Sequence, residues 1–114
     1  FLENKNKDKW CRIINISSSS GINGGKVQIH YAVTKAGLIS LTKSLNNVYG
    51  KKNFTINAIA PGLINTPMIK KEINLKKRIK LKVGKIKEVT EISKIVLKII
   101  SEKYKSKTGM IFKI

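Results

Sequence analysis

The chain has 114 residues, a single cysteine, Cys11, and no apolar run of about 20 residues. One thiol excludes a disulfide scaffold and a multi-thiol zinc site, so we expect a protein of the reducing cytoplasm that holds no metal. The lack of a long apolar run argues against any membrane-spanning helix or membrane partner. The first residues, FLENKNKDKW, contain no apolar core and no small-residue cleavage site, and they are therefore not a signal peptide.

Acidic residues and arginine are also scarce. The chain has 24 lysine and arginine residues against 6 acidic ones, a net charge of +18, yet Arg12 and Arg78 are its only arginines. Nucleic-acid readout favours arginine forks, and the lysines are scattered without interleaved aromatic residues. Lysine, isoleucine and asparagine all have A/T-rich codons. We therefore attribute the excess of lysine to mutational drift in an A/T-rich genome, with lysine at solvent-exposed positions. A basic interaction fragment or a nucleic-acid-binding fragment is the less favoured alternative.

The pattern of apolar residues predicts an α/β fold. Residues 12–17, 54–60 and 110–114 are short and rich in isoleucine, which is typical of buried strands. Residues 28–49 and 89–101 follow helical periodicity, and the first of these helices is apolar enough to be covered on two sides. Residues 66–83 have a weak pattern, and we expect short helical pieces on an exposed segment. The order strand–helix–strand–helix–strand predicts a parallel sheet with helices on both faces, part of a doubly wound unit.

Tyr31 and Lys35 are the first candidate catalytic pair. Their i, i+4 spacing places them on one face of the predicted helix. An ammonium group beside a phenol stabilises the phenolate and lowers a phenol's pKa, which suits general acid–base chemistry near neutral pH. The pair alone is a weak signal, because surface Tyr–Lys pairs at this spacing are common.

Three further features strengthen the signal. A serine-rich strand end precedes Tyr31, the following strand ends in Pro61-Gly62, and LINTPM comes directly afterwards. In a parallel sheet, both strand ends face one crevice. Together, RIINISS…G…YAVTKAGLISLTKSL and INAIAPGLINTPM resemble the short-chain dehydrogenase/reductase family. Within that family they look most like the 3-oxoacyl-acyl-carrier-protein reductase type.

The resemblance implies a catalytic trio. Tyr31 would donate a proton to the substrate carbonyl as hydride arrives from the nicotinamide. Lys35 would assist Tyr31 and bind the nicotinamide ribose. The family's catalytic serine lies thirteen residues before the tyrosine, which selects Ser18 among the four consecutive serines. Ser17 becomes a strand-end neighbour, and Ser19 and Ser20 become turn residues.

The resemblance also implies a cofactor and partners. Pro61 and Gly62 would pack against the nicotinamide of NADP(H) or NAD(H), with NADP(H) slightly preferred. The Ile64 backbone and the Thr66 hydroxyl would bind its carboxamide. The substrate would be a small or carrier-protein-bound carbonyl compound, and the complete protein would be a homodimer or homotetramer. A family member that acts on a sugar or a secondary alcohol stays open as an alternative.

Other family motifs do not occur in this sequence. It contains no glycine-rich turn between a strand and a helix that could hold a pyrophosphate, and GINGG follows the serine strand without opening a helix. We therefore expect residues 1–114 to be a partial domain, the C-terminal catalytic half of a longer reductase. We also expect the chain alone to be inactive.

Overall fold

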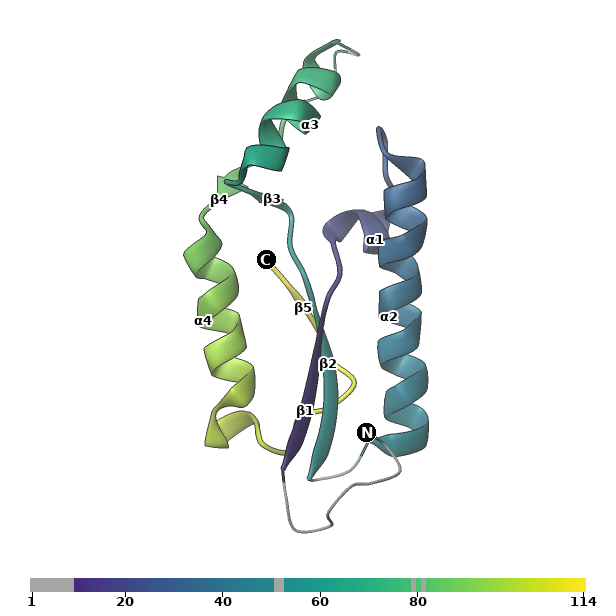
Figure 1. Cartoon of the computed structure of the whole chain (residues 1–114), viewed down its shortest axis with the longest axis vertical. Helices are drawn as coiled ribbons and strands as arrows, with labels where there is room; N and C mark the ends of the chain where they lie inside the picture. Colours follow the sequence, from purple (N-terminus) through teal and green to yellow (C-terminus); the bar gives the residue numbers. More distant parts are fainter. Residues whose placement is uncertain (1–9, 51–52, 79, 81) are drawn as a thin grey trace.

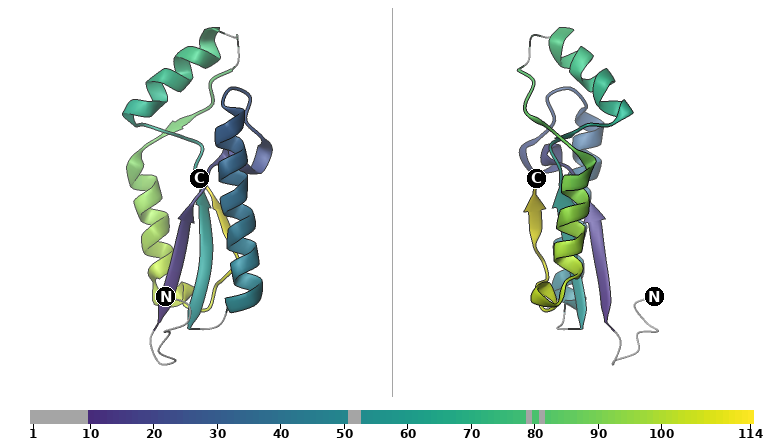
Figure 2. Two further views of the ribbon diagram at one scale, coloured as in Figure 1. Left: turned by 45° about the vertical axis from the view of Figure 1, so that its right-hand side comes forward. Right: turned by 90° about the vertical axis from the view of Figure 1, so that its left-hand side faces the viewer.

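The computed structural model describes residues 10–50, 53–78, 80 and 82–114. Its order of elements is β1 (Cys11–Ile16), α1 (Ser19–Asn23), α2 (Ile29–Tyr49), β2 (Phe54–Ala60), β3 (Leu63–Ile64), α3 (Pro67–Arg78), β4 (Ile86–Lys87), α4 (Val89–Ile100), η1 (Glu102–Tyr104) and β5 (Ile111–Lys113). Strands β1, β2 and β5 form a parallel sheet in the order β1-β2-β5. Helix α2 covers one face of the sheet and α4 the other (Figure 1, Figure 2). The predicted α/β architecture is confirmed.

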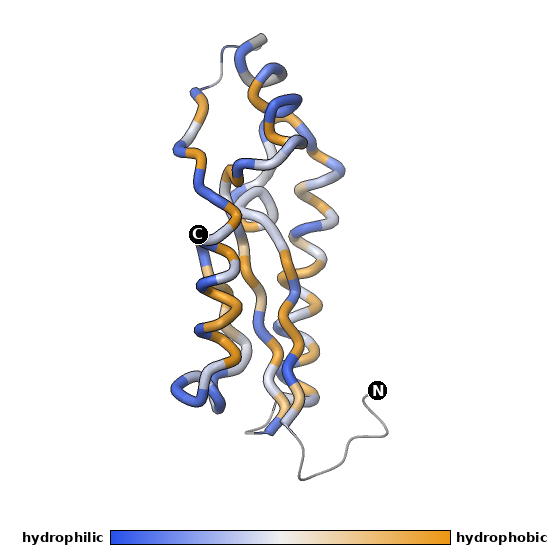
Figure 3. The backbone as a smooth tube through the Cα atoms, turned by 60° about the vertical axis from the view of Figure 1, so that its left-hand side comes forward, coloured by the Kyte–Doolittle hydropathy of each residue, from blue (hydrophilic) through white to orange (hydrophobic). Residues whose placement is uncertain are grey.

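Strand β2 is the centre of the core. All seven of its residues are buried, and Ile56, Ala58 and Ile59 are 0% exposed. A strand between two helical layers is buried on both faces, so the polar residues of FTINAIA, Thr55 and Asn57, are buried together with the apolar ones. The register pairs Cys11 with Phe54 and continues to Ile16 with Ile59. Figure 3 shows hydrophobic residues along the paired strands and along α4, and a hydrophilic turn after α4.

The ends of the predicted strands and helices shift by at most one residue. The strand expected at 54–60 has those bounds, whereas β1 ends at Ile16 and leaves Ser17 and Ser18 beyond the strand. The helix expected at 28–49 begins at Ile29, with Gln28 as its N-cap. Residues 89–101 and 110–114 were expected to form a helix and a strand, and the structure shortens them to α4 and β5. These elements are confirmed in type and order.

The prediction of separate short pieces at 66–83 was wrong, because α3 is one helix of 12 residues. Pro67 suits the first helical position, and the sequence that follows is rich in good helix formers. Ile69 is buried, while many of the lysines are exposed, so the apolar stripe of this helix is narrow. The expected turn at Ser19 and Ser20 was also wrong, because both belong to α1.

Side-chain hydrogen bonds hold β5 against the rest of the sheet. Asn57, which is 1% exposed, donates from Nδ2 to the Lys107 carbonyl at 3.0 Å. Its Oδ1 accepts from the Met110 amide at 3.0 Å. The Thr108 hydroxyl donates to Asn46 Oδ1 on α2 at 2.6 Å and accepts from the Ile56 amide at 3.0 Å. The turn into β5 is therefore fixed by both β2 and α2.

The molecule is elongated, with extents of 53 × 25 × 18 Å and a radius of gyration of 16.0 Å. A compact domain of this length has a radius of gyration of about 13 Å. Among the described residues α2 packs against β1, β2 and α1, and the expected cover on a second side stays a prediction. Its outer surface exposes apolar side chains at Ile29, Val33, Leu41 and Val48. Within the described part of the chain, no helix is long and apolar enough to cross a membrane.

Candidate active site

A cavity of about 430 Å³ opens beyond the carboxyl ends of β1 and β2. Ser18 follows β1, Tyr31 lies in the first turn of α2, and Gly62 follows β2, and all three line this cavity. The segment between α1 and α2 forms one side, with residues that include Gly24, Gly25 and Lys26. Glu72, Lys82 and Lys85, from α3 and the segment after it, also line the cavity. The predicted crevice therefore brings together side chains from segments distant in sequence.

The backbone around Ser18 fixes the position of its side chain. Its backbone is extended, with φ −160° and ψ 154°, and it is the N-cap of α1. Its Oγ accepts a hydrogen bond from the Ser20 amide at 3.1 Å. This bond uses a lone pair of the hydroxyl, so the proton remains able to donate toward the cavity. The side chain is 7% exposed, which limits the positions it can take.

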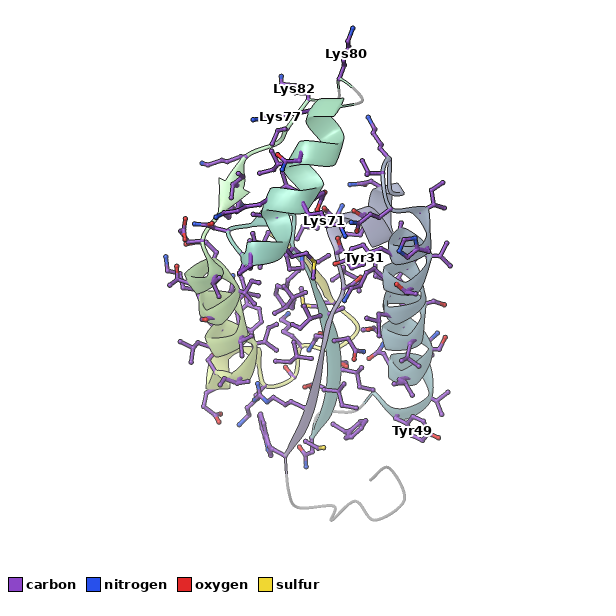
Figure 4. All side chains as sticks on the ribbon, turned by 45° about the horizontal axis from the view of Figure 1, so that its top comes forward. Tyr31, Tyr49, Lys71, Lys77, Lys80 and Lys82 are labelled. Atoms are coloured by element: carbon purple, nitrogen blue, oxygen red, sulfur yellow. The ribbon has the colours of Figure 1, made fainter. Side chains whose placement is uncertain are left out.

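Tyr31 and Lys35 lie on the same face of α2. The Lys35 Nζ is 5.5 Å from the centroid of the Tyr31 ring. The same ammonium group donates to the Ile16 carbonyl at 2.8 Å, at the last residue of β1. Lys35 does not line the cavity; it lies behind Tyr31 with its charge held between strand and helix. Figure 4 shows Tyr31 near one end of α2 and Tyr49 at the other.

A close contact between α1 and α2 sets how Ser18 lies relative to Tyr31. Ser17 is 2% exposed, and its hydroxyl donates to the Lys35 carbonyl at 2.7 Å. At Gly21 a Cβ atom would lie 2.6 Å from the Lys35 carbonyl carbon and 2.8 Å from the Ala36 nitrogen. Only glycine permits this approach without moving backbone. Ser17 was expected to be only a strand-end neighbour, and its place directly before Ser18 was the only sequence signal of this role.

The Pro61–Thr66 segment is joined to the same region. The Pro61 carbonyl accepts from the Ser19 amide at 2.7 Å, and the Gly62 amide donates to the Ile114 carbonyl at 3.1 Å. Ile64 is buried in β3, and the Thr66 hydroxyl donates to its carbonyl at 3.3 Å. Of the predicted residues here, Gly62 lines the cavity, while Pro61, Ile64 and Thr66 lie outside its lining.

Lysine supplies most of the charged side chains that line the cavity. Lys26, Lys82 and Lys85 could not be singled out in the sequence, because they come together only when two distant segments fold. Away from the cavity, the hydrogen bond and charge of Lys94 lower the pKa of Glu91 on α4. No group of three or more potential metal-ligating side chains occurs among the residues that the structure describes.

The family model described as short chain dehydrogenase matches residues 1–77, more than half of the chain. The chain belongs to the short-chain dehydrogenase family. It is 40% identical over 99 residues to the 3-oxoacyl-[acyl-carrier-protein] reductase of Aquifex aeolicus, covering 84% of this chain and 40% of that protein. The family resemblance seen in the sequence motifs is thus confirmed.

Solved short-chain dehydrogenase structures share the fold. A 3-oxoacyl-[acyl-carrier protein] reductase from Brucella melitensis is 30% identical with a TM-score of 0.68, and the match covers 90% of this chain and 40% of that one. The actinorhodin polyketide ketoreductase with NADPH is 23% identical with a TM-score of 0.80, covering 90% of this chain and 45% of that one. This second likeness concerns the fold alone. The chain spans less than half the length of the curated relatives it matches.

Of the residues expected to bind a nicotinamide, Gly62 lines the cavity, and a Cβ there would lie 3.4 Å from the Ile114 carbonyl oxygen, an ordinary van der Waals contact. The Thr66 hydroxyl uses its proton on Ile64 and keeps lone pairs for an amide donor.

Proposed function

We propose that the protein carrying this chain is an NAD(P)(H)-dependent oxidoreductase that reduces the carbonyl group of a 3-oxoacyl thioester. The observation that carries the proposal is the meeting of Ser18 and Tyr31 in one cavity, with Lys35 behind the tyrosine. Ser18 and Tyr31 come from different segments of one concave site, and Tyr31 lies near Lys35. Such an arrangement suits proton transfer to a carbonyl group. Family membership and the similarity to 3-oxoacyl reductases support the same reaction.

In the proposed mechanism, Ser18 and Tyr31 act on the substrate carbonyl oxygen. The Ser18 hydroxyl donates a hydrogen bond to that oxygen while its lone pair accepts from Ser20. The Tyr31 hydroxyl gives its proton to the oxygen as negative charge develops there. The positive charge of Lys35 stabilises the phenolate that remains on Tyr31. When bound, the reduced nicotinamide supplies the hydride.

Cofactor contacts are proposed for the segment after β2. Pro61 and Gly62 pack against the nicotinamide, and the Ile64 backbone with the Thr66 hydroxyl binds its carboxamide. Lys35 contacts the ribose. The slight preference for NADP(H) remains part of the proposal. In this scheme residues 1–114 are the catalytic half of the domain, and a further segment supplies the pyrophosphate site.

Two kinds of partner are proposed: a substrate, from the names of the similar proteins, and a second subunit, from the exposed surface of α2. A carrier-protein-bound thioester is the proposed substrate, since the similar reductases are named for it. The exposed apolar side chains Ile29, Val33, Leu41 and Val48 favour packing of α2 against another subunit in a homodimer or homotetramer.

An assay of the intact protein tests this proposal. Purified protein is mixed with NADPH or NADH and with a 3-oxoacyl thioester, a ketose or a simple ketone. We expect nicotinamide absorbance to fall with the thioester, one cofactor being oxidised for each 3-hydroxyacyl product formed. Turnover of the ketose alone would reject the thioester, and turnover of no carbonyl compound would reject the reductase assignment.

A further inference from the structure

We propose that the cavity contains an anion subsite, formed by Lys26, Lys82 and Lys85, which binds a phosphate or carboxylate group on the substrate. The proposal rests on the proposed function, because it assumes that the molecule reduced beside Tyr31 occupies this cavity. It specifies a substrate class: a carbonyl compound that carries an anionic oxygen group away from the reacting carbon.

The three lysines come from separate parts of the chain. Lys26 lies in the segment between α1 and α2, directly after Gly24 and Gly25. Lys82 and Lys85 lie in the segment between α3 and β4, with Gly84 between them. All three line the cavity that Ser18 and Tyr31 also line. A ligand in this cavity therefore meets ammonium groups from two different segments.

Charge within the cavity is unbalanced. Among the lining residues that the structure describes, Glu72 carries the only carboxylate, against three lysines. The ion pairs described, Lys94 with Glu91 and Lys105 with Glu102, lie elsewhere and involve none of these three lysines. Charges of one sign on the walls of a cleft concentrate their field there and attract a counter-ion. Lys26, Lys82 and Lys85 are all exposed residues of the cavity lining, so an anion from solution can reach them.

Not every lysine near α3 lines the cavity. Figure 4 shows Lys77, Lys80 and Lys82 toward the end of α3 that lies away from Tyr31. Of these three, Lys82 lines the cavity, whereas Lys77 and Lys80 do not. A general attraction of acidic macromolecules would involve these exposed lysines equally. A subsite for a small anion depends on the lining lysines alone, and variants can separate the two.

The first experiment measures anion binding without turnover. The intact protein is labelled with ¹⁵N and titrated with inorganic phosphate at constant ionic strength. We expect saturable shifts of the Gly24, Gly25 and Gly84 amide signals. The Lys82→Gln/Lys85→Gln variant should weaken binding by up to about fivefold for each lysine, the size typical of exposed ion pairs. Lys103→Gln, on η1, should change nothing. Absence of saturable shifts, or an equal loss in the Lys103 variant, overturns the subsite.

The second experiment identifies the source of the anion. The same variants are assayed with a ketone that bears a terminal phosphate and with its dephosphorylated alcohol analogue. We expect KM for the phosphorylated ketone to rise by up to about fivefold per lysine, with kcat and the neutral analogue unchanged. A rise in KM for NADPH alone assigns the lysines to the cofactor phosphate and overturns the proposal. Phosphate-induced shifts without any carbonyl turnover would leave the subsite standing and reject the reductase function.

Discussion

At the scale of single residues, Ser18 caps α1 and lines the cavity with the same hydroxyl group. The Ser20 amide fixes the direction of the oxygen, and the proton is left for a ligand. Ser17 and Gly21 then fix α1 against the Lys35 carbonyl. The position of Ser18 relative to Tyr31 thus depends on residues that touch no substrate.

Gly21→Ala should destabilise the protein, because its Cβ would lie within 2.8 Å of backbone atoms of Lys35 and Ala36. We expect a loss of about 1–3 kcal/mol in the free energy of unfolding, as for overpacked sites. Gly37→Ala is the matched control on α2, where a Cβ would meet nothing within 4 Å. That change should stabilise the helix by about 0.5–1 kcal/mol. Urea unfolding measures both, and equal effects would contradict the close contact proposed for Gly21.

The sequence predicted where the cavity lies. The strand ends at Ser17-Ser18 and Pro61-Gly62 were expected to face one crevice, because the carboxyl ends of parallel strands meet at one edge, and Ser18 and Gly62 line the same cavity. The sequence did not reveal that Ser17 holds α1 against α2 through its hydrogen bond to the Lys35 carbonyl. Nor did it reveal the lysines at 26, 82 and 85. Those roles depend on how α1 packs on α2 and on where the segment after α3 folds back, and no local pattern encodes either.

At the scale of elements, β2 connects the site with the far end of the sheet. Its end leads into Gly62 at the cavity, while Asn57 in its middle organises the turn into β5. The Ala58 amide then donates to the Met110 carbonyl at 2.9 Å. Strand β5 has three residues and relies on these side-chain bonds as well as on its ladder.

Asn57→Ala should loosen β5. The change leaves the Met110 amide and the Lys107 carbonyl without their partner, and an unsatisfied buried group costs about 1–3 kcal/mol. Hydrogen exchange checks this: the amides of Ala58 and Met110 should exchange faster than in the unmodified protein. Unaltered protection at both amides would show that the ladder alone holds β5.

Elements with a strong pattern were predicted well, and weakly patterned ones were not. The mostly apolar segment of β2 and the amphipathic repeat of α4 were found in the sequence because burial on two faces or on one stripe dictates them. Charged and polar residues outnumber apolar ones in α3 and obscured its helical period. Strands β3 and β4 have two residues each and exist only through their pairing with each other, so no sequence window could have shown them.

At the scale of the whole molecule, the chain is long and thin and exposes apolar surface on α2. Its radius of gyration of 16.0 Å exceeds the value of about 13 Å for a compact domain of this length. The 114-residue sequence contains no glycine-rich turn for a pyrophosphate. In the proposed scheme, this catalytic half depends on a further segment for the pyrophosphate site.

NADPH binding tests that dependence. The isolated 114-residue chain should show no saturable rise in nicotinamide fluorescence at micromolar concentrations, because the phosphates contribute most of the charge recognised in such sites. The intact protein should show one. Tight binding by the isolated chain would contradict the assignment of this chain as a half-site.

The central claim is that Tyr31 delivers the proton, and its most direct test is Tyr31→Phe in the intact protein. The change keeps the ring and removes the hydroxyl. Tyr49→Phe is the control, since Tyr49 lies at the opposite end of the same helix (Figure 4). We predict that kcat for carbonyl reduction falls about 100-fold or more in the Tyr31 variant and stays unchanged in the Tyr49 variant. Equal turnover by the Tyr31 variant and the unmodified protein would contradict the account.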